Sequence, residues 1–350
     1  MTTLLTSGLT MPNEFPRRQP NKQFAFPKHV QNKSCTISRQ LMKSLCFVLI
    51  YSSSPACIES KVTLTNAYEI FNILYSLTQE LIELQQNSYT VVRKKWSRIS
   101  SGVTHRSTCV LRISKDVMLD VSTGSSPEFR SFISQDPIAS SMENVALSLR
   151  LLNELVLWSN SNYYRYIRSL PISYQTFMDM TPDDLKHLRG STVLETLVCN
   201  FLFICRQYAY FFNRFQDKTG LQITRSFCFE DYRWAVSSVM SRNNLIPKGD
   251  EGAKKMCMIP IWDMINHKTG RVTTDFNPES GELIFYAMES TKPGDQIFMD
   301  YGARTSAEFL LFSGFVPAHN PHNHVRVTFG KHHPLIHCLF TVYHKLVDHG

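Results

Sequence analysis

The sequence predicts an α+β fold in which a long block of helices is followed by a strand-rich unit. Between Ser141 and Phe215, apolar residues recur at the spacing of one helix face, which is typical of helices packed on a core. After Gly270, the pattern changes to short runs separated by turn residues, as in antiparallel strands. A chain of 350 residues that is 43% hydrophobic can also bury a full core.

The helical block divides into several predicted helices. Four polar residues lie off the apolar stripe of the first one: Glu143, Asn144, Arg150 and Glu154. The next helix is expected to stop at Pro171, and another to begin at Thr181, where a capping threonine precedes Pro182 and two acids. Residues 194–215 and 229–244 are each expected to form one long helix. The stripe itself consists of Met142, Val145, Ala146, Leu149, Leu152, Leu155 and Val156.

The strand-rich unit contains three predicted strands, at residues 272–276, 282–286 and 296–299. Residues 277–281 contain turn residues and are expected to close a hairpin between the first two. An apolar run at residues 259–267 is also strand-like and ends on two polar residues. Polar side chains at the end of an apolar element are well placed to meet a ligand.

The N-terminal region differs in composition from the rest. Residues 1–60 hold seven Lys or Arg against two Glu, and they contribute much of the net charge of +8. Without a nucleic-acid motif this excess indicates a disordered basic tail, so no nucleic-acid partner is predicted. Residues 66–96 are expected to form an amphipathic helix capped by Asn66. No apolar run approaches the roughly 20 residues that a bilayer span needs, so no membrane partner is predicted.

Cysteine and histidine usage argues against a metal site. The nine cysteines are odd in number and include no C-x-x-C pair, so the sequence supports neither a zinc knuckle nor a disulfide framework. Cys199 and Cys205 lie in apolar runs and are expected to be small buried hydrophobes. This usage favours a reducing compartment, the cytoplasm first and the nucleus second. Six histidines between His319 and His337 lack a carboxylate or cysteine partner pattern and are interpreted as a solvated loop.

Two short motifs carry the main functional signal. Asn266-His267 is followed by Asp300-Tyr301-Gly302, with Trp262-Asp263 before the first motif and Ser313-Gly314-Phe315 after the second. Together and in this order they resemble the paired signature of SET-domain methyltransferases, which use S-adenosylmethionine. The stretch at residues 230–244 is closer still to those members of the Rubisco large-subunit methyltransferase-like group that methylate a histidine of actin. The resemblance covers residues 113–330.

The resemblance implies a domain organisation. A SET domain would occupy residues 110–330, with residues 140–228 as an all-helical insert that forms one side of the substrate groove. Residues 331–350 would begin a helical substrate-binding domain of which only the start is present. Family members also have a glycine-rich loop whose backbone approaches the cofactor. The matching residues 98–109 contain one glycine and no Gly-x-Gly, so part of that wall is expected to be lost or replaced.

The resemblance also assigns site residues. Tyr301 and Asn244 would be catalytic, with Tyr301 lining the methyl-transfer channel and Asn244 orienting the target ring. His267 is interpreted as a backbone contributor and core residue rather than a base, and Asp300 departs from the family in replacing an aromatic residue. The target peptide would be bound by Asn144, Arg206, Asn244, Trp262 and Arg304. S-adenosylmethionine would be held by Arg242, Asp263, Met264, Ile265, Asn266, His267, Ser313, Gly314 and Phe315.

The chemistry of methyl transfer favours histidine as the target. A lysine must first lose a proton from a pKa of about 10.4, whereas a neutral imidazole already carries a lone pair at pH 7 and needs only to be oriented. Asn244 can both donate and accept a hydrogen bond for that purpose. Together with the resemblance, which implies actin as the substrate and is retained at Asn244 and Trp262, this chemistry leads us to expect a monomeric protein-histidine N-methyltransferase that acts on actin and needs no metal. A lysine methyltransferase and a catalytically inactive actin-binding variant remain open alternatives.

Overall fold

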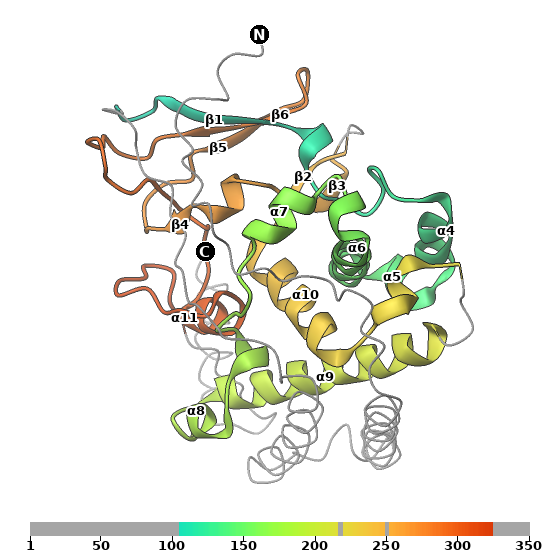
Figure 1. Ribbon diagram of the computed structural model, residues 1–350. Coiled ribbons are helices and arrows are strands. Elements are labelled where there is room, and N and C mark those ends of the chain that lie inside the picture. Colours follow the sequence, from blue (N-terminus) through green and yellow to red (C-terminus); the bar gives the residue numbers. More distant parts are fainter. Residues whose placement is uncertain (1–104, 216–219, 249–251, 325–350) are drawn as a thin grey trace, which may run out of the picture.

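The computed structural model describes residues 105–215, 220–248 and 252–324. In this part of the chain the helices gather on one side and the strands on the other, which confirms the predicted α+β class (Figure 1). The predicted tail at 1–60, the helix at 66–96 and the domain start at 331–350 lie outside the described residues. None of the helices within the described ranges is long and apolar enough to cross a membrane.

The helical side is organised around α6 (Glu143–Leu157) and α10 (Phe229–Arg242), which pack against each other. The long helix α9 (Thr192–Phe215) runs across one end of this pair (Figure 1). The remaining helices are α4 (Pro127–Gln135), α5 (Pro137–Ser141), α7 (Tyr164–Ser169) and α8 (Pro182–Lys186). Short 3-10 turns join them, namely η2 (Trp158–Asn160), η3 (Phe177–Asp179) and η4 (Gln222–Ser226).

The predicted helix boundaries are confirmed where capping chemistry defines them. Thr181 caps α8 in a capping box, in which its hydroxyl accepts from the Asp184 backbone N–H (3.2 Å). α7 ends at Ser169, before Pro171. α10 ends at Arg242, two residues earlier than predicted. There the Asn243 side chain donates to the Val239 carbonyl (2.6 Å), and the backbone turns into a strand.

The amphipathic interpretation of α6 is wrong at two positions. Arg150 and Glu154 lie off the apolar stripe, yet they are 1% and 3% exposed and pair with each other across one helical turn. Arg150 also donates to the Thr123 carbonyl (3.0 Å), and the Ser161 hydroxyl donates to Glu154. Loops on both sides of the helix thus supply the partners without which two buried charges would be strongly unfavourable.

One cysteine expectation is confirmed and the other is wrong. Cys205 is fully buried, whereas Cys199 is exposed. Cys199 lies one helical turn from Phe203, which is itself 46% exposed, so the two belong to the outer face of α9. The composition of this run concealed the helix face that points away from the core.

The strands form three small sheets. β1 (Cys109–Ser114), β6 (Glu282–Tyr286) and β5 (Thr274–Asn277) make an antiparallel sheet in that order, and Asn277 pairs with Glu282, which confirms the predicted hairpin. β2 (Asn243–Pro247) pairs antiparallel with β3 (Lys254–Met258). β4 (Asn266–His267) pairs in parallel with β7 (Phe298–Met299). β5 and β7 each begin two residues later than the strands predicted at 272–276 and 296–299.

The strand predicted at 259–267 is wrong. Ile261 has φ 71° and ψ −47°, which interrupts an extended backbone, and a 3-10 turn follows as η5 (Trp262–Met264). Only Asn266 and His267 remain to pair as β4. Other short elements are η1 (Lys115–Val117) after β1, α11 (Ser306–Glu308), and the π-helix η6 (Phe309–Ser313).

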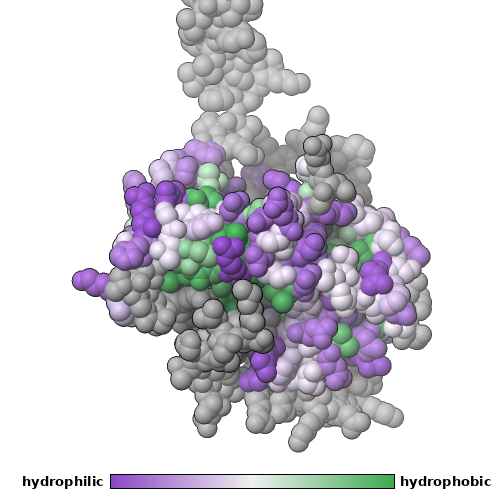
Figure 2. All heavy atoms as spheres, turned by 90° about the horizontal axis from the view of Figure 1, so that it is seen from above, coloured by the Kyte–Doolittle hydropathy of each residue, from purple (hydrophilic) through white to green (hydrophobic). Residues whose placement is uncertain are grey.

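Two hydrophobic clusters make up the core. The larger lies among the helices and includes Leu149, Phe201 and Tyr232. The smaller lies among the strands and includes Ile265, Phe285 and Met299. On the face seen in Figure 2, hydrophobic residues show in small areas among hydrophilic ones. α10 leads from the first cluster into β2 at the second, and the candidate site lies at this junction.

Candidate functional site

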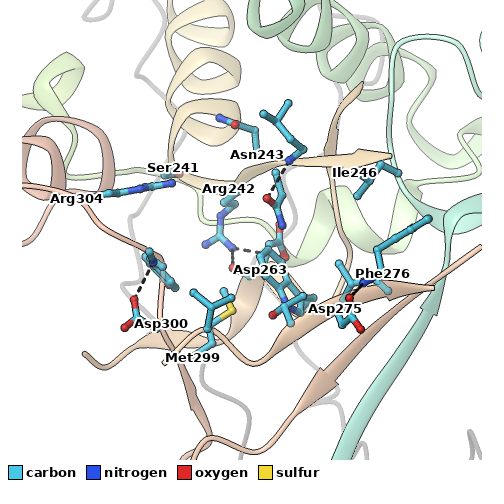
Figure 3. A pocket seen from close by; sticks show the side chains of 18 residues that line it. Ser241, Arg242, Asn243, Ile246, Asp263, Asp275, Phe276, Met299, Asp300 and Arg304 are labelled. Atoms are coloured by element: carbon cyan, nitrogen blue, oxygen red, sulfur yellow. Dashed lines mark hydrogen bonds and ion pairs between the residues drawn. The ribbon is translucent and has the colours of Figure 1, made fainter. Parts of the chain in front are cut away.

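A pocket of about 310 Å³ opens where α10 passes into β2. Its walls come from the end of α10, β2, η5, β5, β6 and the segment after β7 (Figure 3). The lining residues are Ser241, Arg242, Asn243, Asn244, Leu245, Ile246, Trp262, Asp263, Val272, Thr274, Asp275, Phe276, Leu283, Met299, Asp300, Tyr301, Gly302 and Arg304. Segments far apart in the sequence therefore meet in one cavity.

A charged pair, Arg242 and Asp263, forms one wall of the pocket (Figure 3). The Arg242 Nη1 donates to the Asp263 carbonyl oxygen (2.7 Å) and lies 3.8 Å from the Asp263 Oδ1. Burial raises the pKa of Asp263 to about 6, although the Arg242 charge and a hydrogen bond from the Tyr166 hydroxyl oppose it. Arg242 is also the last residue of α10, where a cation is favoured by the helix dipole.

Two buried atoms of this pair have no hydrogen-bond partner among the described residues: the Arg242 Nε and the Asp263 Oδ1. Buried polar atoms in folded proteins are nearly always hydrogen-bonded. An unsatisfied donor and an unsatisfied acceptor in the same ion pair therefore fit a ligand that carries both a carboxylate and an ammonium group. The amino-acid end of S-adenosylmethionine has this chemistry, so the residues present fit that cofactor.

Backbone strain lies directly beside this pair. Ile261 is a β-branched residue with φ 71°, a conformation that costs on the order of 1–3 kcal/mol and persists where the surroundings enforce it. It positions Trp262, whose indole N–H donates to the Thr274 hydroxyl (3.2 Å). The strained turn thus places the Trp262 indole against β5.

Tyr301 lines another part of the pocket, and the His267 ring lies beside it. The Tyr301 backbone N–H donates to the His267 Nδ1 (3.1 Å), and its hydroxyl donates to the Ile265 carbonyl (2.8 Å). The His267 ring lies 4.8 Å from the Phe309 ring and 6.0 Å from the Phe315 ring, measured between centroids. Burial raises the pKa of Tyr301 to about 12 and lowers that of His267. Both are therefore neutral at pH 7.

Asp300 shapes the turn that carries Tyr301. Its two carboxylate oxygens accept from the backbone N–H groups of Gly302 and Gly270, each at 2.8 Å. Gly302 has φ 90°, which a glycine adopts without strain. The residue that departs from the family pattern therefore holds the turn rather than facing a ligand with a free carboxylate.

Asn244 lies in β2 and not at the end of a helix as predicted. Its Oδ1 accepts from the Leu245 backbone N–H (2.9 Å), while the amide nitrogen has no partner in the described part of the chain. That nitrogen remains available to a group in the pocket.

The structure brings together some of the predicted site residues and separates others. Arg242, Asn244, Trp262, Asp263, Tyr301 and Arg304 line the pocket. Met264, Ile265, Asn266, His267, Ser313, Gly314 and Phe315 are not among its lining residues, although the ring contacts place His267 and Phe315 directly behind Tyr301. Asn144 on α6 and Arg206 on α9 do not line it either. The roles assigned to all of these residues stay predictions.

Sequence reasoning missed Tyr166 and Tyr174. The Tyr166 hydroxyl donates to the Asp263 carboxylate, and the Tyr174 ring lies 5.9 Å from the Arg242 guanidinium carbon. Neither residue belongs to a recognisable motif. Both lie within the helical block, and no local sequence signal connects either of them to the pocket.

The described histidines near the end of the chain do not form a metal site. Within residues 105–215, 220–248 and 252–324, no group of three or more His, Cys, Asp or Glu could hold an ion. The His319 carbonyl instead accepts from the Thr269 hydroxyl (3.1 Å), and His322 and His324 are exposed. His332, His333 and His337 lie outside the described residues.

Comparison with known proteins gives a family. A family model described as "SET domain" matches residues 128–302, which is half of the chain. Actin-histidine N-methyltransferases from Gallus gallus, Homo sapiens and Danio rerio are each 35% identical over 223 residues. These matches cover 63% of this chain and 37% of the relatives, so the chain spans little more than a third of their length.

Solved structures show the same fold at lower identity. Rubisco LSMT bound to AdoMet superposes with a TM-score of 0.51 at 19% identity, covering 65% of this chain and 51% of that one. The SET domain of LSMT bound to Lysine and AdoHcy gives 0.51 at 17% identity, covering 73% and 58%. These findings confirm the predicted family and its β-rich fold with helices between the strands.

Proposed function

This chain belongs to the SET-domain family, and on that basis we propose that it transfers a methyl group from S-adenosylmethionine to a histidine ring of actin. The relatives that are 35% identical carry this activity in their name. The observation that supports the proposal most directly is the unsatisfied pair of Arg242 Nε and Asp263 Oδ1 in the pocket wall.

The chain's own residues would bind and orient both reactants. Arg242 and Asp263 would hold the carboxylate and the ammonium group of S-adenosylmethionine, which when bound supplies a methyl group on a sulfonium. Tyr301 and Trp262 would exclude water and stack the target ring. Because Tyr301 stays protonated at neutral pH, its hydroxyl acts as a hydrogen-bonding wall and not as a base.

A histidine target suits this pocket better than a lysine. A neutral imidazole needs no prior deprotonation, whereas a lysine would need a base, and the Asp263 carboxylate, whose pKa is raised to about 6, is already paired with Arg242. The Asn244 side-chain oxygen, which accepts from the Leu245 backbone N–H, has a second lone pair that can accept from the ring N–H while the other ring nitrogen attacks. We further propose that the protein is a cytoplasmic monomer and that it needs no metal for this reaction.

The first test is calorimetric titration of S-adenosylmethionine into the folded chain and two variants. Arg242→Lys keeps the charge but removes the unsatisfied Nε, and should weaken binding by at least about tenfold. Arg233→Lys is a matched control, because Arg233 lies on the same helix, is 18% exposed against 17% for Arg242, and pairs with Asp179 outside the pocket. Equal binding by both variants would argue against the assigned cofactor site.

The second test identifies the target. Actin is incubated with the chain and methyl-deuterated S-adenosylmethionine, and the modified residue is located by mass spectrometry. A deuterated methyl group on histidine supports the proposal, and one on lysine supports the lysine alternative. Cofactor binding without transfer, or actin binding without cofactor binding, would favour the inactive variant and overturn the proposed activity.

A further inference from the structure

Tyr166 connects the helical block to the pocket through one hydroxyl group. Tyr166 lies in α7, and its O–H donates to the Asp263 Oδ2, a contact between residues 97 positions apart. Tyr166 and Asp263 are each 7% exposed. No other side chain is within hydrogen-bonding distance of the Asp263 carboxylate in the described ranges. Besides the ion pair with Arg242 at 3.8 Å, this hydroxyl is therefore the side-chain contact that holds the carboxylate.

The geometry points to Tyr166 as a positioning residue: its hydroxyl anchors one oxygen of Asp263, so that the other oxygen stays beside the Arg242 guanidinium and available to a cationic group of the ligand. This inference rests on the proposed cofactor site. Tyr166 does not line the pocket, so it would act through Asp263 alone. The backbone contact from Arg242 to the Asp263 carbonyl (2.7 Å) holds the main chain but leaves the side-chain torsion free.

The direction of proton donation is set by burial. Burial raises the pKa of Tyr166 well above its ordinary value, and the Asp263 charge raises it further. The proton therefore stays on the tyrosine, and its hydroxyl donates to the ionised carboxylate. On Asp263, the same hydrogen bond opposes the upward effect of burial on the pKa.

Four groups face Asp263 from the elements packed around it. They are Arg242 from α10, Tyr166 from α7, Tyr174 from the segment that follows α7, and Tyr301 from the segment after β7. Arg242 is the one cation among these four, and the tyrosines stay neutral at pH 7. Because the hydrogen bond from Tyr166 lowers the pKa of Asp263, removal of this hydroxyl should raise that pKa above its value of about 6.

The test compares Tyr166→Phe with Tyr163→Phe. Both substitutions keep a buried ring, and Tyr163 is 8% exposed against 7% for Tyr166. The Tyr163 hydroxyl donates to the Met118 carbonyl (3.0 Å), away from the pocket. Any effect of losing one buried hydroxyl in general would appear in both variants.

Two measurements are made from pH 5 to 8.5. In ¹³C NMR of protein labelled at its aspartate carboxyl groups, the Asp263 signal is assigned by its loss in Asp263→Asn. Tyr166→Phe should move the midpoint of this titration upward by about one pH unit, as expected for the loss of one hydrogen bond to a charged group. In calorimetry, Tyr166→Phe should weaken S-adenosylmethionine binding by about tenfold at pH 7. The pH below which the affinity falls should also move upward. Tyr163→Phe should match the wild type in both.

Failure of the positioning role of Tyr166 can be distinguished from failure of the proposed function. An unchanged Asp263 titration in Tyr166→Phe would overturn the positioning role, whatever the cofactor does. A wild-type chain that is folded but binds no S-adenosylmethionine would overturn the proposed function, while the carboxyl titration would still decide the role of Tyr166. Equal shifts in both variants would show a general structural effect and would also overturn the inference.

Discussion

Replacing Gly314 with alanine tests how the helical block is joined to the wall of the site. Gly314 ends the π-helix η6 with φ 77° and ψ 23°, a left-handed conformation that costs a non-glycine residue about 1–2 kcal/mol. A Cβ atom at this position would lie 2.6 Å from the Gln175 carbonyl oxygen and 2.7 Å from its carbon. Because both atoms belong to the backbone, the two segments must separate. Adding the strain and the displacement, we expect a loss of about 3 kcal/mol or more in the free energy of unfolding.

Gly302→Ala supplies the matched control. Gly302 has φ 90°, but an added Cβ would have no neighbour within 4 Å, so only the conformational cost of about 1–2 kcal/mol applies. The stiffening of the unfolded chain is the same in both variants and cancels in the comparison. Urea unfolding monitored by fluorescence gives the two free energies, and calorimetry gives cofactor affinity. If Gly314→Ala costs no more than Gly302→Ala, the close approach to Gln175 does not constrain the fold, and the reasoning is refuted.

Three further substitutions test the charge network and the site. Asp120→Asn should cost about 2 kcal/mol at pH 7. Burial raises the pKa of Asp120, but hydrogen bonds, first that with Lys255, lower it to about 2. The contribution is lost as the pH falls from about 5 towards 2, so the urea midpoints of variant and wild type should converge there; a constant gap would contradict this. Glu154→Ala leaves Arg150 buried without its counter-charge and should cost about 3–5 kcal/mol in chemical unfolding, a prediction that a loss below about 1 kcal/mol would reject. Tyr301→Phe removes one hydrogen bond, worth about 1 kcal/mol, and should abolish methyl transfer to actin while the circular dichroism spectrum is unchanged; retained transfer would remove Tyr301 from the catalytic residues.

Local chemistry made part of the fold predictable. The cap at Thr181 and the turn before Glu282 are set by residues within a few positions of each other, and both appear in the structure as expected. α9 follows from an apolar periodicity that extends over many turns. In each case the residues that determine the element are close to one another in the sequence.

Elements that depend on distant partners were not predictable in the same way. The burial of Arg150 depends on the Thr123 carbonyl, and that of Glu154 on the Ser161 hydroxyl, and neither partner is visible in the period of α6. The apolar run before Asn266 has the composition of a strand, but the positive φ of Ile261 ends it.

The same distinction applies to the candidate site. Arg242, Asp263 and Tyr301 could be named because they lie in contiguous motifs, and the structure places all three in one pocket. Tyr166 could not, since its only connection to the site is a side-chain contact made across the fold. A residue that contacts a site residue without lining the pocket need not belong to any sequence motif.

The parallel pairing of β4 with β7 has a consequence for the order of folding. It joins Asn266 to Phe298, and the Tyr166–Asp263 contact closes a loop of 97 positions. The entropy lost in closing such loops must be overcome before their contacts stabilise anything, so non-local pairings form slowly. The lining residues Asp263 and Met299 belong to these two contacts, so we expect the complete pocket to form late in folding. A ligand that binds there would select the finished fold, and the thermal midpoint should rise with the logarithm of its concentration.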